Sequence, residues 1–326
     1  MAQPTNLFDR YGGTKAVRED LANVIYNISP EDTPFMSSIG RENVSNTYFE
    51  WQVDALAAAS AANAAIEGDD ATLDARTATN RVGNYTQISR KVIGVSQTVE
   101  AVDKAGIKSY LAYELAKASS EIKRDMESSL LTNQAAVVGN STTARRTAGL
   151  PAWIRTNFSK GVGGAEPTMS ATNDGYPSVA RTDGTQRAIT ETFLGDAIQQ
   201  VWAQGGDPKI AMFGPVNKRK ASAFAGIATN RMNQNNGAPK AYSIVATADV
   251  YLSDFGKVSF VANRFQRERE VFVLDPEYAS VGYLRNFKTE DLAKTGDSTK
   301  KMIIVEYGLK VKTEKSHAII ADLTIT

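Results

Sequence analysis

The spacing of apolar residues predicts one long helix in the first half of the chain, over residues 107–138. Apolar side chains recur every three or four residues and so line one helix face: Leu111, Leu115, Ala118, Ile122, Met126 and Leu130. Two pairs of opposite charge four residues apart, Lys117 with Glu121 and Lys123 with Glu127, suit an opposite, solvated face. About 30 residues at ~1.5 Å each make a rod of ~45 Å. We expect this helix to end near Gly139.

An alanine-rich segment just upstream predicts a protruding arm. Strand-like patterns at 48–53 and 85–99 flank it, with Ile93, Val95 and Val99 alternating with small or polar residues in the second. Residues 54–81 contain eleven alanines, and the only larger apolar residues among them are Leu56, Ile66 and Leu73. Alanine favours a helix, but such small side chains cannot build a core. We therefore expect a long two-stranded arm, which is marginal alone in water and needs a neighbour to lie on.

The remaining segments predict a mixed, α+β arrangement. A short amphipathic helix is expected at 17–28, and a surface loop rich in Gly, Ser and Thr at 157–187. A helix marked by Leu194, Ile198, Val201 and Trp202 is expected to stop at Gly205, a second helix is expected at 216–224, and a mobile loop at 230–239. Strands are expected at 209–213, 242–252, 257–262, 271–274, 280–284, 301–307, 309–313 and 318–325. The pattern indicates a layer of the long helix with C-terminal strands, and a mixed domain inserted between them.

Composition narrows the class of protein without naming a chemistry. The chain has 326 residues, 42% hydrophobic and 22% charged, with a net charge of +1, so it is not a polyelectrolyte binder as a whole. Residues 1–50 hold seven acidic and four basic side chains, which argues against a basic nucleic-acid-binding tail. We expect no membrane span and no secretory signal. The absence of cysteine excludes disulfides and thiolate sites and fits a reducing cytoplasm.

Residues that could carry catalysis are few. His317 is the single histidine and has no serine in a nucleophile-elbow pattern, so we expect a packing or surface role. The glycines at 161–164 are not followed by a lysine and a helix, as a phosphate loop requires. An acidic cluster could offer oxygen ligands to Mg²⁺ or Ca²⁺ but does not match a calcium-loop spacing: Glu67, Asp69, Asp70 and Asp74. We interpret it as a solvated loop tip, and expect no catalytic residue, cofactor or bound metal.

A charged segment and the tryptophans leave alternatives open. Residues 264–270, RFQRERE, alternate in charge and suit either a subunit contact or a solvated turn. We expect Trp153 and Trp202 in the core, whereas Trp51, at the base of the arm, suits an interface or the core.

The order of these parts resembles the major capsid protein of tailed bacteriophages, with the Hong Kong 97 fold. The segments that carry the resemblance cover nearly the whole chain: IYNISPEDTPFMSSIGR (25–41), YFEWQVDAL (48–56), EGDDA (67–71), QISRKVIGVSQTVEAVDKAGI (87–107), EIKRDMESSLLTNQ (121–134) and YGLKVKTEKSHAIIADL (307–323). The resemblance implies an N-terminal arm at 1–45, an extended hairpin loop at 46–97 and a peripheral domain with a spine helix at 98–150. An axial domain would span 151–295, and strands at 296–326 would return to the peripheral domain.

By this resemblance, the chain would self-assemble into pentamers and hexamers of an icosahedral head enclosing double-stranded DNA, with loop 226–240 near each capsomer centre. The implied partners are other copies, a portal protein, a separate scaffolding or decoration protein, and DNA bound without sequence specificity. The protein would lie in the virion capsid and assemble in the host bacterial cytoplasm, with no membrane contact. The candidate subunit contacts are Trp51, Leu56, Ile66, Glu67, Asp69, Asp70, Arg81, Arg231 and Asn235.

Some members of this family crosslink their shells through a lysine on the extended loop, and others carry a fused scaffolding segment. Here no lysine lies between Lys15 and Lys91, so we expect no such crosslink. The similarity begins by Ile25, so we also expect no fused scaffold. Two alternatives to a phage head protein remain open. One is an encapsulin-like cargo compartment, and the other is a carboxylate or Mg²⁺-dependent enzyme that uses Glu67, Asp69 and Asp70.

Overall fold

The computed structural model describes residues 32–68, 70, 73–75, 78–103, 106–171, 174–224 and 250–325. The helix expected at 17–28, the loop expected at 226–240 and most of the strand expected at 242–252 lie outside these residues. The helices are α1 (Pro34–Ser38), α2 (Gln97–Ala101), α3 (Tyr110–Leu131), α4 (Glu191–Ala203) and α5 (Pro215–Ala221). The strands are β1 (Gly40–Asn43), β2 (Tyr48–Val53), β3 (Asn80–Tyr85), β4 (Gln87–Ser96), β5 (Phe158–Ser159), β6 (Thr168–Met169), β7 (Pro177–Val179), β8 (Ile210–Phe213), β9 (Val250–Ser253), β10 (Gly256–Ala262), β11 (Val271–Leu274), β12 (Ala279–Asp291), β13 (Ser298–Val311) and β14 (Ala318–Ile320).

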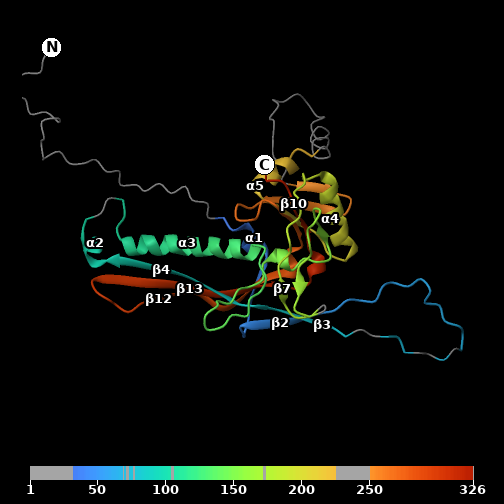
Figure 1. The fold of residues 1–326 in the computed structure, drawn as a ribbon, viewed down its shortest axis with the longest axis horizontal. Helices are drawn as coiled ribbons and strands as arrows, with labels where there is room; N and C mark the ends of the chain where they lie inside the picture. Colours follow the sequence, from blue (N-terminus) through green and yellow to red (C-terminus); the bar gives the residue numbers. More distant parts are fainter. Residues whose placement is uncertain are drawn as a thin grey trace, which may run out of the picture.

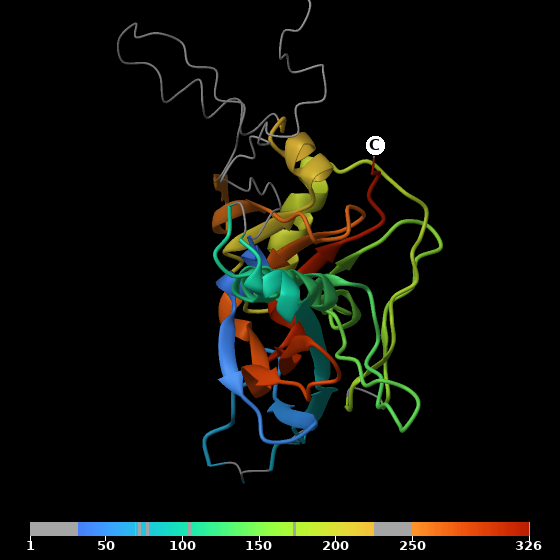
Figure 2. The same cartoon turned by 90° about the vertical axis from the view of Figure 1, so that its left-hand side faces the viewer.

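The molecule has three parts, which Figure 1 shows side by side. The rod consists of α3 and a four-stranded sheet of order β1-β12-β13-β4. The compact body consists of a six-stranded sheet, of order β5-β14-β11-β8-β10-β9, with α4 and α5. The arm, residues 54–79, extends from β2 and β3 away from both. In the end-on view, α3 lies between the four-stranded sheet and the compact body (Figure 2).

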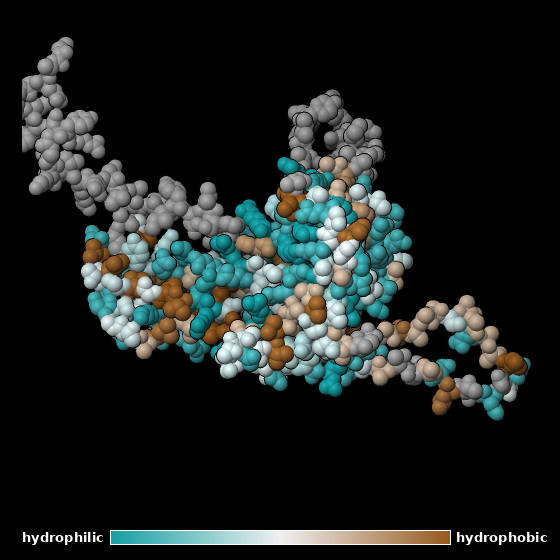
Figure 3. Space-filling view, viewed as in Figure 1, coloured by the Kyte–Doolittle hydropathy of each residue, from teal (hydrophilic) through white to brown (hydrophobic). Residues whose placement is uncertain are grey.

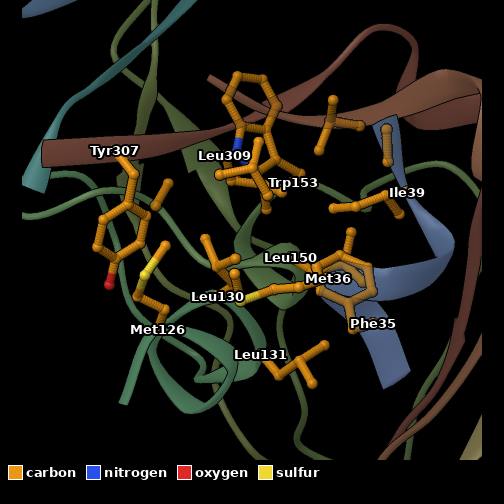
Figure 4. Packing of buried hydrophobic residues seen from close by; sticks show 14 of the residues in the cluster. Phe35, Met36, Ile39, Met126, Leu130, Leu131, Leu150, Trp153, Tyr307 and Leu309 are labelled. Carbon is orange, nitrogen blue, oxygen red and sulfur yellow. The ribbon is translucent and has the colours of Figure 1, made fainter. Parts of the chain in front are cut away.

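Helix α3 buries the face that the sequence predicts. Ala118, Ile122, Met126 and Leu130 are buried in the rod's core, and Leu115 packs against its edge. The Ser109 hydroxyl caps the start of α3 by accepting a hydrogen bond from the backbone N–H of Ala112 at 3.2 Å. This core joins α1, α3, β13 and the segment at 148–154, as the packing around Leu130 and Leu150 shows (Figure 4).

The expected end of this helix near Gly139 is wrong, because α3 ends at Leu131. Thr132 is already extended, and the next residues pair with a returning segment through a bridge between Val137 and Arg146. The Gln134 side chain donates hydrogen bonds to the carbonyls of Ser129 and Thr147. The carbonyl of Ser129, in the last turn of α3, therefore has a hydrogen-bond donor. Tertiary pairing thus overrides local helix propensity here.

Two strands, β12 and β14, belong to a different sheet from the one that the expected domain boundaries imply. β12 lies before residue 295 and so falls in the expected axial domain, yet it pairs with β13 and β1 in the rod. β14 lies in the segment expected to return to the rod, yet it pairs with β11 and β5 in the compact body. Both strands are assigned by pairing partners distant in sequence, which local patterns do not reveal. The segments expected at 301–307 and 309–313 form one continuous strand, β13.

Several expected side-chain environments can now be compared with the structure. Trp153 is buried, as predicted, but Trp202 is 55% exposed and stacks near Phe255 on the surface, so its prediction is wrong. His317 is fully buried, which confirms the packing role: its Nδ1 accepts from the backbone N–H of Asp275, and its Nε2 lies 3.4 Å from the carbonyl of Tyr278. Burial lowers the pKa of His317 to about 4, so it is neutral at pH 7.

Glu127 is the main correction to the expected solvated face of α3. Its carboxylate is fully buried and accepts hydrogen bonds from the backbone N–H groups of Phe35 at 2.7 Å and Met36 at 2.9 Å. It also accepts a hydrogen bond from the side-chain amide of Asn263 at 2.7 Å. Burial raises the pKa of Glu127, whereas these three hydrogen bonds lower it. One carboxylate therefore joins the N-terminal segment, the rod and the loop that follows β10 in the compact body.

Most of the charged segment at 264–270 is buried or partly buried, so it is not simply a solvated turn, and a subunit contact stays a prediction. Arg267 and Arg181 contact Glu270 at 2.7 and 3.2 Å, and both Arg181 and Glu270 have fully buried side chains. Arg269 pairs with Asp322 at 3.3 Å. Arg181 lies near the end of the loop expected on the surface at 157–187, so this part of the loop belongs to the buried ionic cluster. Burial raises the pKa of Glu270 to about 7, although both arginines lower it.

We predict that Glu127→Ala loosens the N-terminal segment. It leaves three buried donors without an acceptor, and each unsatisfied donor costs about 1–3 kcal/mol unless it regains water. The free energy of unfolding of the unassembled subunit should fall by about 2–4 kcal/mol in denaturant titrations. Limited proteolysis should cut near residues 32–39 faster. Glu121→Ala, which removes only a surface carboxylate from the same helix, should cost less than about 1 kcal/mol. Equal losses in the two variants would contradict a special role for Glu127.

We also predict a pH dependence that comes from Glu270. A folded-state pKa of about 7, above the ordinary 4.5, means that the folded protein holds this proton more tightly. Stability from this group is therefore greatest below about pH 4.5 and falls by up to about 3 kcal/mol as the pH rises to 7. Glu270→Gln should flatten this part of the stability profile, whereas Glu277→Gln, on an exposed side chain, should leave it unchanged. A Glu270→Gln profile parallel to that of the wild type would refute the assignment.

Candidate assembly surfaces

The arm is paired only at its base. β2 and β3 form six antiparallel pairs, from Tyr48 opposite Tyr85 to Val53 opposite Asn80, and no strand is assigned between them in the described residues. The three large apolar side chains beyond the base, Leu56, Ile66 and Leu73, are 99%, 79% and 102% exposed. Figure 3 shows this segment standing clear of the body, with hydrophobic residues along it. An exposed apolar segment of this kind marks an interaction site.

The base of the arm is held firmly, which sets the direction of the arm. Trp51 is half-buried and stacks on Phe49 and Trp153, with ring centroids 5.8 and 5.3 Å apart. On the neighbouring strand, the backbone N–H of Gly83 donates to the carbonyl of Gly175 at 2.8 Å. Trp51 therefore contributes to the subunit's own core, and an additional interface role stays a prediction.

Arg81, also at the base, has a mostly exposed side chain. Its guanidinium lies 3.7 Å from the carboxylate of Glu50, while its backbone N–H donates to Asp174 Oδ1 at 2.6 Å. A surface ion pair at this distance contributes little stability. The side chain of Arg81 therefore remains open to contacts with another molecule.

The acidic cluster lies on the outer half of the arm. Glu67, Asp70 and Asp74 are exposed, and none has an ion-pair partner within the described ranges. Asp69 lies outside the described residues. The part of the chain that the structure describes contains no group of three or more His, Asp or Glu residues close enough to hold a metal ion. Of the remaining candidate contacts, Arg231 and Asn235 also lie outside the described residues.

A groove of about 920 Å³ runs between the arm and the body, and no sequence pattern predicts it. Arm residues such as Ala55 and Ala57 form one wall, and Trp153 and Met169 line the other side. At its rim, Glu314 is held by the backbone N–H groups of Arg155 and Thr156, both at 3.1 Å. Glu314 is 159 residues from Arg155 and 158 from Thr156 in sequence, so the rim forms only in the folded chain.

These surfaces suit binding by shape and charge more than reaction chemistry. The one histidine is buried and neutral, and the exposed carboxylates sit on a thin, open segment. Within the described residues, no helix combines the length and apolarity needed to cross a bilayer.

Comparisons with known proteins agree with this view. A family model described as "SU10 major capsid protein" matches residues 3–324. A curated major capsid protein of Escherichia phage Phieco32 is 31% identical over 341 residues, covering 95% of each chain.

Solved structures with this fold include capsid chains of distant sequence. The capsid of Cyanophage A-1(L) matches with a TM-score of 0.66 at 11% identity, covering 95% of this chain and 98% of that one. A Gordonia phage Cozz chain matches with a TM-score of 0.62 at 11% identity, covering 99% and 98%. A holo-SrpI encapsulin complex from Synechococcus elongatus matches with a TM-score of 0.56 at 13% identity, covering 98% and 97%.

The α+β class is confirmed by these matches, and the family and its curated member are structural proteins, not enzymes. The chain therefore belongs to the SU10 major capsid protein family and is a structural subunit of a phage capsid.

Proposed function

We propose that copies of this subunit assemble into pentamers and hexamers of an icosahedral head that encloses double-stranded DNA, and that the arm makes the contacts between copies. The observation that carries this proposal is the arm itself, whose large apolar side chains lie fully exposed on a firmly held base. Transfer of one such side chain from water to an apolar contact contributes about 1.5–3 kcal/mol. The subunit alone gains none of this energy.

A closed shell suits contacts of this modest strength. Symmetry reuses each patch many times, and once a subunit is held at one point, its remaining contacts form at a high effective concentration. Individually weak contacts also let misplaced subunits dissociate. Alanine side chains have no rotamer freedom to lose, so ordering an alanine-rich arm on assembly costs backbone entropy but little side-chain entropy.

The proposed contents and partners follow from the role of a head protein. A net charge of +1 is compatible with a shell around DNA. The inner wall need not be strongly basic, because packaged DNA brings its own counterions. We propose that the shell also joins a portal protein and a separate scaffolding or decoration protein, and that it assembles in the host cytoplasm. A cargo compartment is the second candidate, favoured by the encapsulin match. The contents of purified particles, DNA or enzyme, distinguish the two.

We predict that deletion of residues 57–80 yields soluble subunits that no longer close shells, because the exposed apolar contacts are lost. Negative-stain microscopy and size-exclusion chromatography of the expressed protein would measure this. Replacing Ala57, Ala58 and Ala59 with serine keeps the length of the arm and should leave particles intact. If the deletion variant forms normal closed particles, the arm is not needed for assembly.

A further inference from the structure

Residues 157–171 and 174–187 form two limbs that connect the compact body with the base of the arm, and we call them the strap. The limbs pair with each other through β6 and β7. Figure 1 shows the strap in yellow-green, running from the compact body to the region of β3. Two of its apolar side chains, Val162 and Val179, are 85% and 54% exposed, so apolar burial alone does not hold it in place.

A single carboxylate anchors both limbs at the end next to the compact body, the root of the strap. Asp322 is fully buried, and its two oxygens accept hydrogen bonds from the backbone N–H groups of Gly161 at 2.9 Å and Gly184 at 2.8 Å. Arg269 donates to the carbonyl of Gly184 at 2.7 Å and lies 3.3 Å from Asp322. Arg181, from the strap itself, lies 3.5 Å from the same carboxylate. The root is therefore held by charge-assisted hydrogen bonds, which are stronger than neutral ones.

The glycines at 161–164, which do not fit a phosphate loop, have a structural reason at this root. A Cβ on Gly161 would collide with the carbonyl oxygen of Thr185 in the other limb, and a Cβ on Gly184 would collide with the backbone nitrogen of Gly164. Only glycine lets the two limbs approach closely enough for one carboxylate to reach both.

The opposite end of the strap, its tip, is bonded to the base of the arm. The N–H of Gly175 donates to the carbonyl of Arg81, and the carbonyl of Gly175 accepts from the N–H of Gly83, both at 2.8 Å. The N–H of Arg81 donates to Asp174 Oδ1 at 2.6 Å. Tyr176 packs edge-on against a tyrosine from each strand of the base, with ring centroids 5.1 and 6.1 Å away. A two-stranded ribbon is marginal alone, so the strap stabilises β2 and β3 as a third segment.

Between its root and its tip, the strap is also bonded to the segment that follows α3. The Asn133 side chain donates to the carbonyl of Arg181 at 2.8 Å, and the N–H of Ala136 donates to the carbonyl of Pro177 at 2.9 Å. The buried ionic cluster, the end of the rod's helix and the base of the arm thus belong to one continuous set of backbone hydrogen bonds. Such contiguous bonding can carry a displacement from one site to the other.

We propose that the strap fixes the direction of the arm from the compact body, with Asp322 as the positioning residue at its root. Asp322 is fully buried within the subunit, so its carboxylate acts on the arm without contacting another copy. The consequence for assembly rests on the proposed function. An arm held in one direction is preorganised, whereas a loosened arm must be ordered at every contact, which weakens assembly.

The test is Asp322→Asn, read at the far end of the strap. Asparagine tolerates the left-handed backbone at residue 322, where φ is 59°, but it offers an acceptor oxygen to only one of the two N–H donors. Hydrogen exchange in the unassembled subunit should become about tenfold faster at the amides of Arg81 and Gly83, which donate to the strap. Arg269→Gln, on a partly exposed side chain, is the milder variant and should act in the same direction.

Two control variants separate positioning from a general loss of stability. Val258→Ala opens a cavity in the core of the same compact body, on β10 and away from the strap. Lys160→Ala removes an exposed ion pair with Glu166 within the strap. Both should leave exchange at the two amides of β3 within about twofold of the wild type.

A distance measurement reports the direction of the arm itself. The chain contains no cysteine, so Gln52→Cys with Thr192→Cys provides a specific pair of labelling sites, one exposed on β2 and one exposed on α4. Pulsed electron paramagnetic resonance of unassembled, spin-labelled subunits should give a broader distance distribution once Asp322→Asn is added. The same label pair with Val258→Ala should keep the original width.

Assembly completes the test. In sedimentation assays, Asp322→Asn should lower the yield of closed shells by about tenfold, whereas Val258→Ala should not. Three results would overturn the inference: unchanged exchange in folded Asp322→Asn, equal acceleration by Val258→Ala, or an undiminished yield of shells despite faster exchange. If Asp322→Asn does not fold, Arg269→Gln decides by the same criteria. A wild type that never forms shells would refute the proposed function, while exchange in the single subunit would still decide whether the strap positions the arm.

Discussion

The buried carboxylate of Glu127 is the polar interaction at which the N-terminal segment, the rod and the compact body meet, within an apolar core that the two sheets share. It gathers two backbone donors from the N-terminal segment and one amide from Asn263, so three parts of the chain meet at one group. A buried charge without a cation is costly unless hydrogen bonds satisfy it. The arrangement therefore holds only while α1 and the loop after β10 are both in place, and each part stabilises the position of the other.

The exposed surfaces differ from the interior in how their charged and apolar side chains are partnered. Within the subunit, charges are paired and buried, as in the cluster of Arg181, Arg267 and Glu270. On the arm and on the face of the rod's sheet that points away from α3, apolar side chains such as Leu73 and Val92 lack cover, and Arg90 is exposed. Strong interactions therefore fix the shape of each subunit, whereas we propose that the exposed groups make weaker, reversible contacts between subunits, where errors must be corrected.

Sequence patterns predicted what depends on local spacing. The buried face of α3 followed from its period because one side of the helix packs on one sheet. The protrusion of the arm followed from its lack of large side chains, but the expected two-stranded pairing along it is wrong for the described residues, since β2 and β3 stop at Val53 and Asn80. The environment of Glu127 was mispredicted because its spacing from Lys123 suits a solvated pair, while its actual partners lie 91, 92 and 136 residues away. β12 and β14 were misplaced for the same reason. The exposed apolar residues Ile88 and Val92, on the face of β4 that points away from α3, were missed because β4 carries a second apolar set, Ile93 and Val95, on the face toward α3.

The two-sided pattern of β4 has a physical explanation in an assembly. A strand that serves a single subunit needs only one apolar face, and a second one invites nonspecific association. Here the inner face carries Lys91, whose charge is paired with α3, while the outer face carries Arg90, whose charge has no partner among the described residues. A basic residue within the apolar strip discourages pairing of two such faces with each other, because like charges would meet.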